Sequence, residues 1–271
     1  MANQTRLTQW VLKHKTMLNP SFTEFNWPTR YFNGLSDFEA VLSIDGLTAI
    51  GRGIDANKEL AIEKASSEAI ERLICQRLCI SSVGVAISGE VSSETHAQCE
   101  ALERYYFDEH IKLNQPFILI KSKSTEKLIN QFKKQNDNAT LEFYKMATPA
   151  PSFGIVCKIS CEQKNPLLGL SLDTDFERAL NKSLNEALVN YARLMDSPGT
   201  FHQEINANKD MWLCDTVFLN SIESLFNNQA KDSSLISLPA LSIKKLDISS
   251  IRELEGCPID PIHISAFRGN S

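Results

Sequence analysis

An internal repeat constrains the fold of this chain more than any other feature of its sequence. Three segments share a core of x-Glu-Ala-(Ile/Leu): 67–72 reads Ser-Glu-Ala-Ile-Glu-Arg, 99–104 reads Cys-Glu-Ala-Leu-Glu-Arg, and 185–190 reads Asn-Glu-Ala-Leu-Val-Asn. The leading glutamate of each copy follows a glycine by 16 or 17 residues, and each glycine lies in or next to a strand-like run. The glycines are Gly51, Gly84 and Gly169, and the glutamates are Glu68, Glu100 and Glu186. A strand, a turn and a long helix are therefore predicted three times.

The residues around the first copy predict a β-hairpin followed by a long helix. Residues 38–44 and 47–51 are strand-like, and Asp45-Gly46 between them is a hairpin turn signal. A helix is expected from about Asn57 to Leu78, because apolar residues recur there at helical spacing.

Other segments continue this alternation of strands and helices. Further strands are expected over 83–89, 117–120, 141–146, 154–159 and 167–172 and near Ile243, and further helices up to about His110 and over 126–135, 177–195 and 222–227. Ser92-Ser93 are candidate caps for the helix that ends near His110. Thr174-x-x-Glu177 predicts a capping box at the start of the third long helix.

The pattern predicts the mixed α/β class, with repeated strand-turn-helix units and helices packed on a mixed sheet. Residues 1–36 hold a short amphipathic stretch around Trp10 and then a connection that contains Pro and aromatic residues. We expect these residues to form an N-terminal arm packed on the domain. Residues 37–271 are expected to form a single compact domain that ends in an irregular, Pro-rich tail.

Composition limits the classes of partner. With 42% apolar residues, the 271-residue chain has enough apolar material for a core without disulfides. Its net charge of -5 argues against a non-specific nucleic-acid binder, which needs a basic face. No run of about 18 apolar residues predicts a membrane span, and no secretory signal is recognisable. We therefore expect a cytoplasmic protein without nucleic-acid or membrane partners, whose seven cysteines are reduced and mostly buried.

The repeat also carries acidic and basic groups at helical spacing. In its first two copies, carboxylates at i and i+3 and a guanidinium at i+4 share one face of a helix. On a solvated helix this pattern is a surface ion pair worth only about 0.2–1 kcal/mol. Two such helices packed together would bring four carboxylates close, and their repulsion would favour a bound cation. Magnesium takes oxygen ligands and shares them with nucleotide phosphates, which Arg72 and Arg104 are suited to contact.

The motifs resemble those of the YcaO family. Residues 51–53 (Gly-Arg-Gly) and 68–72 (Glu-Ala-Ile-Glu-Arg) are similar to that family's first nucleotide motif, a Gly-Lys-Gly strand end followed by a helical Glu-x-x-Glu-Arg. Residues 82–86 and 100–105 resemble the second motif, Ser-Asn-Gly and then Glu-x-x-Glu-Arg. Residues 154–186 resemble the third, and all three motifs occur in the family's order.

The resemblance implies a YcaO-type α/β fold with a pocket for ATP and Mg2+. Members of that family use ATP to activate a peptide backbone amide oxygen, which leaves as phosphate after a nucleophile attacks the carbonyl carbon. A Cys, Ser or Thr side chain gives an azoline by cyclodehydration, and a sulfide source gives a thioamide. The implied role is post-translational modification or ribosomal natural-product (RiPP) biosynthesis. The implied partners are a peptide or protein substrate and a separate leader-binding or sulfur-transfer protein, and a homodimer is left open.

By the same resemblance, the motif residues take roles at the site. Magnesium is expected at Glu68, Glu71, Glu100 and Glu103, and the nucleotide or its phosphates at Arg72, Arg104, Ser82 and Glu186. Lys64 stands where the family has a serine, four residues before the first glutamate, and is expected either to pair with phosphate or to occupy a metal position. Asn190 follows Val189, which stands at the family's glutamine, and is its expected substitute. No residue is assigned as catalytic.

Two other interpretations stay open. A non-catalytic nucleotide-binding or scaffolding relative, acting with a partner enzyme, would keep the same motifs, and Lys64, Val83 and Val189 depart from the family's pattern. Residues 38–73 also have the order of strand, Gly-x-Gly and Ala-rich helix found in double-stranded RNA binders. The acidic net charge and the absence of a Lys-Lys pair at Lys58 argue against that class.

Overall fold

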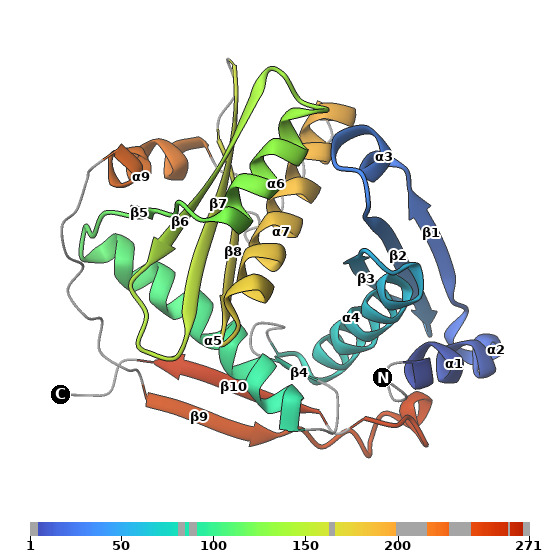
Figure 1. Cartoon of the computed structure of the whole chain (residues 1–271). Coiled ribbons are helices and arrows are strands. Elements are labelled where there is room, and N and C mark those ends of the chain that lie inside the picture. The colour runs from blue at the N-terminus through green and yellow to red at the C-terminus, as the bar shows by residue number, and fades with distance from the viewer. Residues whose placement is uncertain are drawn as a thin grey trace. The chain divides into compact units, whose positions relative to one another are not determined.

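The computed structural model describes residues 5–80, 85–86, 91–162, 166–198, 216–227, 240–259 and 261–267. The chain separates into two compact units, whose elements are labelled in Figure 1. Unit 1 comprises Met1–Ala101 and Leu241–Ala266, and unit 2 comprises Leu102–Ala240 and Phe267–Ser271. Within the described ranges, every helix is too short or too polar to cross a membrane.

A three-stranded sheet with one long helix across it forms the body of unit 1 (Figure 1). The strands are β1 (Ser21–Phe25), β2 (Ser36–Ile44) and β3 (Leu47–Asp55), antiparallel in the order β1-β2-β3, and the helix is α4 (Lys58–Leu78). Asp45 and Gly46, between β2 and β3, have positive φ angles of 47° and 80°. A two-residue hairpin turn needs this backbone geometry, so the predicted hairpin is confirmed together with the helix that follows it.

Helix α4 lies so close to β3 that only glycine fits at two contact points. A Cβ atom on Gly51 would collide with the helix backbone at Ala65 and Ala69. A Cβ atom on Gly53 would collide with it at Ala61 and Ala65. All three alanines are fully buried. The small residues on both elements bring the strand edge within reach of polar side chains from α4.

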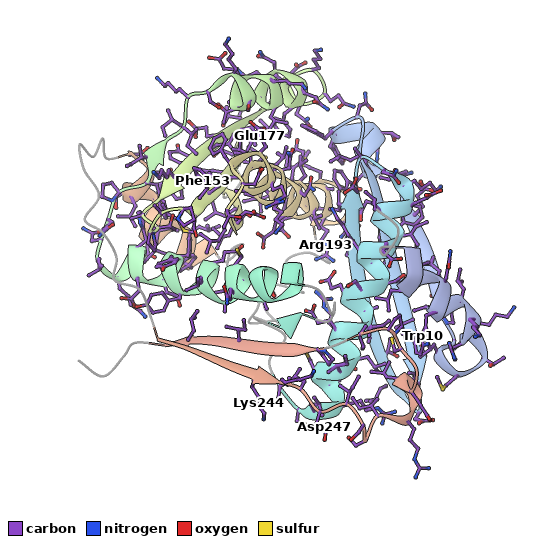
Figure 2. The ribbon with its side chains drawn as sticks, turned by 60° about the horizontal axis from the view of Figure 1, so that its bottom comes forward. Trp10, Phe153, Glu177, Arg193, Lys244 and Asp247 are labelled. Atoms are coloured by element: carbon purple, nitrogen blue, oxygen red, sulfur yellow. The ribbon has the colours of Figure 1, made fainter. Side chains whose placement is uncertain are left out.

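The residues before β2 include a helix that packs on α4. They comprise α1 (Thr5–Lys13), α2 (Lys15–Leu18), β1 and α3 (Trp27–Tyr31), of which the sequence predicted the amphipathic stretch in α1 but neither β1 nor α3. Trp10 of α1 is 8% exposed and shares an apolar core with α4 (Figure 2). Glu63 of α4 accepts hydrogen bonds from the N–H groups of Leu7 and Thr8, at 3.2 and 3.0 Å. A carboxylate from α4 therefore satisfies donors in the first turn of α1.

A second sheet in unit 1 includes the C-terminal strands. Its order is β4 (Val85–Ala86), β10 (Ile262–Phe267) and β9 (Ala240–Lys245), with β10 antiparallel to β4. A short 3₁₀ helix spans Arg252–Leu254. The strand predicted near Ile243 is confirmed, but the irregular tail was wrong for 262–267, because pairing with a distant strand sets their conformation. Most of the predicted strand 83–89 lies outside the described residues.

Unit 2 contains a four-stranded antiparallel sheet (Figure 1). The strands of this sheet are, in order, β5 (Ile118–Leu119), β6 (Ala139–Met146), β7 (Phe153–Cys161) and β8 (Leu167–Asp173). The helices of unit 2 are α6 (Lys123–Lys133), α7 (Phe176–Asp196), α9 (Thr216–Asn227) and the C-terminal half of α5 (Val91–Lys112). Every residue of β8 is buried, so both faces of the sheet are covered there. The predicted mixed α/β class, with helices packed on sheets, is confirmed.

Alternating side chains of β7 show which helix covers each face. Cys157 faces α7, where burial and the neighbouring Glu186 carboxylate raise the pKa of its thiol. Lys158 points to the other face, where its Nζ lies 2.7 Å from Glu223 Oε1 and 4.8 Å from the ring centroid of Phe226 in α9. The sheet of unit 2 is therefore sandwiched between α7 and α9.

The starts of two helices differ from the predictions. The N-cap of α7 is Asp175, whose Oδ1 accepts from the N–H of Arg178 at 2.9 Å. The predicted capping box at Thr174 was wrong, because the carboxylate one position later is a stronger acceptor for the helix N-terminus. Helix α5 begins before residues 92–93, which therefore do not precede it as caps.

Candidate functional site

Glu68, the leading glutamate of the first copy, binds the outer edge of β3. Its Oε2 atom accepts a hydrogen bond from the backbone N–H of Arg52 at 2.6 Å. In the described sheet β3 is an outer strand, with β2 on its other side. The carboxylate therefore supplies the acceptor that a further strand would otherwise supply.

Arg72 completes the contact with the same strand edge. Its guanidinium donates to the C=O of Ile50 at 2.7 Å and to Oε1 of Glu68 at 2.5 Å. In an extended strand, the C=O of one residue and the N–H two positions later point to the same side. Glu68 and Arg72 thus bind the two backbone groups that flank Gly51. We call such a pair an edge clamp.

Glu186 and Asn190 form the edge clamp of the third copy, in unit 2. Glu186 Oε2 accepts from the N–H of Leu170 at 2.6 Å, and Asn190 Nδ2 donates to the C=O of Leu168 at 3.5 Å. These two backbone groups flank Gly169 on β8, which is an outer strand of its sheet. In both clamps, 16 positions separate the strand donor from the glutamate. The first and third copies are therefore alike down to individual hydrogen bonds.

Lys64 is ion-paired with an aspartate at the end of β3. Its Nζ lies 2.7 Å from Asp55 Oδ2 and 3.2 Å from the C=O of Ile54. Asp55 also accepts from the N–H of Asn57 at 2.9 Å. Burial by itself would raise the pKa of Asp55, but the hydrogen bonds from Asn57 and Lys64 outweigh it and lower the pKa. The ammonium group predicted to meet phosphate or to replace a metal thus fastens α4 to β3.

The third copy repeats this arrangement at the end of β8. Asp173 accepts from the N–H of Asp175 at 3.0 Å and lies 3.2 Å from Lys182 Nζ. Arg178 adds a third partner, with Nη2 2.9 Å from Asp173 Oδ1. Burial would raise the pKa of Asp173, but the hydrogen bonds from Arg178, Asp175 and Lys182 lower it below its ordinary value.

Glu71 lies among other carboxylates of unit 1 and not on the strand edge. It is partly buried and forms no hydrogen bond to any residue that the structure describes. Burial raises the pKa of Glu71 well above its ordinary value, the charges of Glu100 and Glu68 raise it further, and Arg72 only partly offsets them. Burial and the charge of Glu71 also raise the pKa of Cys75, to about 12. Unit 1 thus has a region of excess negative charge beside α4.

The two glutamates of the second copy, both on α5, fall in different units. Glu100 belongs to unit 1, where its charge acts on Glu71. Glu103 belongs to unit 2, where its Oε2 accepts from the N–H of Leu172 at 3.1 Å. Leu172 lies on β8, two positions after the donor to Glu186. Two carboxylates therefore share the outer edge of β8.

Arg104 lies close enough to Glu186 for their charges to interact. Burial raises the pKa of Glu186, while the positive charge of Arg104 and the N–H of Leu170 act to lower it. Within unit 2, Arg104 thus stabilises the ionised form of the carboxylate that holds the strand edge.

The predicted site residues therefore fall into two groups, those that contact a strand edge and those that do not. The edges of β3 and β8 engage Glu68, Arg72, Glu103, Glu186 and Asn190, whereas Glu71 and Glu100 interact with each other in unit 1. Ser82 lies outside the described residues. Across the described ranges, no three His, Cys, Asp or Glu side chains are grouped to hold a metal ion.

The sequence did not indicate the partners of Arg52. Its Nε lies 3.0 Å from Oδ1 of the fully buried Asp37, and its guanidinium lies 4.5 Å from the ring centroid of Phe25. The indole N–H of Trp27 donates to the same Asp37 carboxylate. No sequence signal pointed to this contact, because Asp37 precedes the predicted strand 38–44 and lies on the face of β2 opposite its apolar residues. The side chain of Arg52 thus joins the strands, while its N–H binds Glu68.

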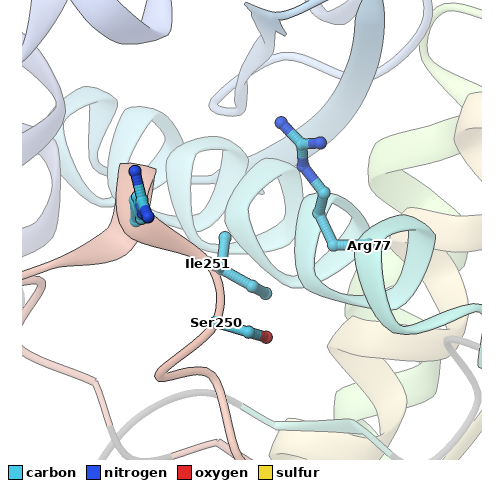
Figure 3. Close-up of a pocket in the computed structure, with 4 residues that line it drawn as sticks. Arg77, Ser250 and Ile251 are labelled. Atoms are coloured by element: carbon cyan, nitrogen blue, oxygen red, sulfur yellow. The ribbon is translucent and has the colours of Figure 1, made fainter.

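A cavity of about 190 Å³ in unit 1 is lined by Arg77, Ser250, Ile251 and Arg252 (Figure 3). The guanidinium of Arg77 points away from Ser250 and Ile251, and its Nη2 lies 3.4 Å from Asp45 Oδ2. The sequence gave no sign of this cavity, because its residues come from the end of α4 and from a segment near the C-terminus.

No protein-family model matches the sequence, and no curated protein matches it. Solved structures do match. The structure of YcaO from Methanopyrus kandleri bound with AMPPCP and Mg2+ is similar, with a TM-score of 0.61 and 10% identity, covering 97% of this chain and 90% of that chain. A heterocyclase in complex with substrate and cofactor has a TM-score of 0.63 and 9% identity, covering 96% of this chain. This chain spans 52% of that heterocyclase, about half its length.

The class defined by the units and their contacts is a mixed α/β protein built from strand-helix copies with clamped sheet edges. Two solved structures that match the chain identify this fold. The chain has the fold of YcaO proteins, and the predicted resemblance is confirmed at that level.

Proposed function

We propose that this protein binds ATP and Mg2+ and uses them to activate a backbone amide of a peptide or protein, as in cyclodehydration. The fold supports this proposal, since it is shared with a YcaO structure bound to AMPPCP and Mg2+ and with a heterocyclase in complex with substrate and cofactor. ATP would supply the phosphoryl group that makes the amide oxygen a leaving group. Thioamide formation is the same activation completed by a sulfide source.

The observation that carries the proposal is the negative charge around Glu71. Its carboxylate is partly buried, interacts with Glu100 and Glu68, and has a raised pKa for these reasons. Carboxylates kept close together favour a hard divalent cation with oxygen ligands. Glu71 and Glu100 would therefore hold magnesium in unit 1, and the predicted phosphate contact at Arg104 stays a prediction for unit 2.

Calorimetric titration with ATP, with and without Mg2+, tests the site. Glu71→Gln and Glu100→Gln should each weaken Mg2+-dependent ATP binding by about tenfold or more, as expected when a charged ligand to a metal is removed. Glu59→Gln makes the same change at an exposed position in the first turn of α4 and should leave binding nearly unchanged. Failure of the parent protein to bind ATP at millimolar concentration with Mg2+ would refute the proposal.

The pH dependence of stability without metal gives a second test of Glu71. Its folded-state pKa is raised, so its contribution to the free energy of unfolding is fully present below the ordinary value of 4.5 and is lost as pH rises through the folded-state pKa. In metal-free buffer at pH 7, Glu71→Gln should therefore be more stable than the parent by about 1–2 kcal/mol. Denaturant unfolding should show this gap closing near pH 4, and an equal gap at both pH values would argue against buried charge.

The non-catalytic alternative has its own support. Three of the carboxylates predicted for the site, Glu68, Glu103 and Glu186, accept hydrogen bonds from strand N–H groups. A scaffold would bind ATP and Mg2+ but release no phosphate with any peptide and its partner protein. Phosphate release that depends on both a candidate peptide and Glu71 would favour the enzyme. The proposed partners remain a peptide substrate and a leader-binding or sulfur-transfer protein, in the cytoplasm.

A further inference from the structure

We propose that Glu68 and Glu186 are positioning residues that close the outer edges of β3 and β8, and that the carboxylate which meets the ligand in the first copy is Glu71. The edge role stands on contacts within each unit. The role of Glu71 rests on the proposed function.

Both oxygens of Glu68 are already engaged. Oε2 accepts from the N–H of Arg52 at 2.6 Å, and Oε1 accepts from Arg72 at 2.5 Å. Direct coordination of a metal by Glu68 would compete with an amide and a guanidinium, and a lost strand contact would leave a backbone donor unsatisfied. Among the described residues, Glu71 forms no hydrogen bond that metal coordination would break. The two glutamates of one motif are thus suited to different tasks.

The third copy allows the two roles to be examined separately, because it has a glutamate at the position of Glu68 but not at the position of Glu71. Glu186 binds the N–H of Leu170 at the same 2.6 Å that separates Glu68 from its donor. The position of Glu71 is occupied by Val189, which has no oxygen to offer a cation. The leading glutamate therefore occurs, with its strand contact intact, in a copy that cannot supply the second carboxylate.

The basic member of the clamp leads to the same conclusion. Arg72 and Asn190 differ in charge and length, yet both donate to the C=O that precedes the glycine, in Ile50 and Leu168. The feature common to both copies is thus the contact with the strand backbone and not an ion pair. The Arg72 and Glu68 side chains are also 45% and 32% exposed, where an ion pair by itself contributes little.

Amide hydrogen exchange measured by NMR on the full chain tests the edge role. In Glu68→Ala, the Arg52 amide should exchange about tenfold faster or more, because its acceptor is gone. In Glu186→Ala, the same should happen at Leu170. Each substitution should leave the other amide unchanged, since the two strands belong to separate sheets. Glu68→Gln and Glu186→Gln keep an acceptor oxygen and should restore most of the protection.

ATP titration of the glutamine variants tests the division of labour. With Mg2+, Glu68→Gln should bind ATP within about threefold of the parent, because an amide oxygen still accepts from Arg52, while Glu71→Gln should lose about tenfold or more. The proposal is overturned if the Arg52 amide is equally protected in Glu68→Ala, or if Glu68→Gln loses as much affinity as Glu71→Gln. If Glu68→Ala does not fold, the Glu186 variants carry the exchange test. Absence of ATP binding by the parent would refute the proposed function, and the exchange results would still decide the edge role.

Discussion

The first and third copies of the repeat share the packing of a helix on a strand, and they differ in a side chain that does not contact that strand. In both, a helix packs against a strand glycine, Gly51 or Gly169, that has no room for a Cβ atom. In both, the glutamate of an edge clamp accepts from the N–H that follows this glycine. The copies differ at Glu71 and its counterpart Val189, which do not take part in the strand contact. Backbone packing thus fixes some positions of the motif and leaves others free to differ between the copies.

The helix starts extend the comparison. Asn57 caps α4 by accepting from the N–H of Leu60 at 3.2 Å, and Asp175 caps α7 by accepting from the N–H of Arg178 at 2.9 Å. Both caps follow an aspartate that is ion-paired with a lysine of the same helix. The strand, cap and helix therefore form one structural unit that occurs in both parts of the chain.

The largest effect is expected where the helix backbone meets the strand glycine. Gly51→Val and Gly169→Val should each lower the free energy of unfolding by about 3 kcal/mol or more, because the new side chain meets helix backbone that cannot move aside. Ser171→Gly is the matched control, since Ser171 stands on β8 where β3 has Gly53, and should cost no more than about 1 kcal/mol. Urea unfolding measures all three, and similar losses in the valine variants and the control would break the comparison.

An intermediate effect is expected at the aspartates that end the strands. Asp173 has an arginine partner that Asp55 lacks in the structure, so Asp173→Asn should cost about 1–2 kcal/mol at pH 7 and Asp55→Asn less. The pKa of Asp173 is lowered from 3.8, so its contribution is present above that pH and is lost as pH falls through the folded-state pKa. Thermal unfolding at pH 7 and pH 3 should show the cost of Asp173→Asn shrinking in acid. A cost independent of pH would contradict the ion pair.

The smallest effect concerns the basic member of the clamp. Asn190→Arg makes the third copy like the first and adds an i, i+4 ion pair with Glu186, which should raise the free energy of unfolding by about 0.3–0.5 kcal/mol. High salt should remove most of this gain, because the pair is partly exposed. A variant less stable than the parent would indicate that the space beside Leu168 admits asparagine but not arginine.

Local patterns predicted the parts of the fold that local interactions determine. Asp45-Gly46 indicated a hairpin turn and the structure has one, and the spacing of apolar residues after Asn57 located α4 within a residue at its start. The repeat of Glu68 and Glu186 indicated equivalent strand-helix copies, which the hydrogen bonds reproduce.

Long-range pairing explains what the sequence did not predict. Residues 262–267 form a strand that pairs with β4, and their alternation Ile-His-Ile-Ser is a strand signal too short to be decisive beside the prolines at 258 and 261. The site depends on long-range contacts in the same way. The ion pair of Lys64 with Asp55 was not predicted, because the two residues meet only when α4 folds back on β3. Glu68 and Glu71 have similar sequence contexts, and only the packing of α4 on β3 tells them apart.

The clamped edges also limit how a peptide can be recognised. Extended peptides often dock by adding a strand to an open sheet edge, through the same N–H and C=O groups that a neighbouring strand would use. On β3 the groups flanking Gly51 are occupied by side chains, and on β8 the N–H groups of Leu170 and Leu172 are occupied. If the proposed function holds, a peptide substrate would be held by contacts other than strand addition at these two edges. The same occupancy discourages edge-to-edge aggregation there.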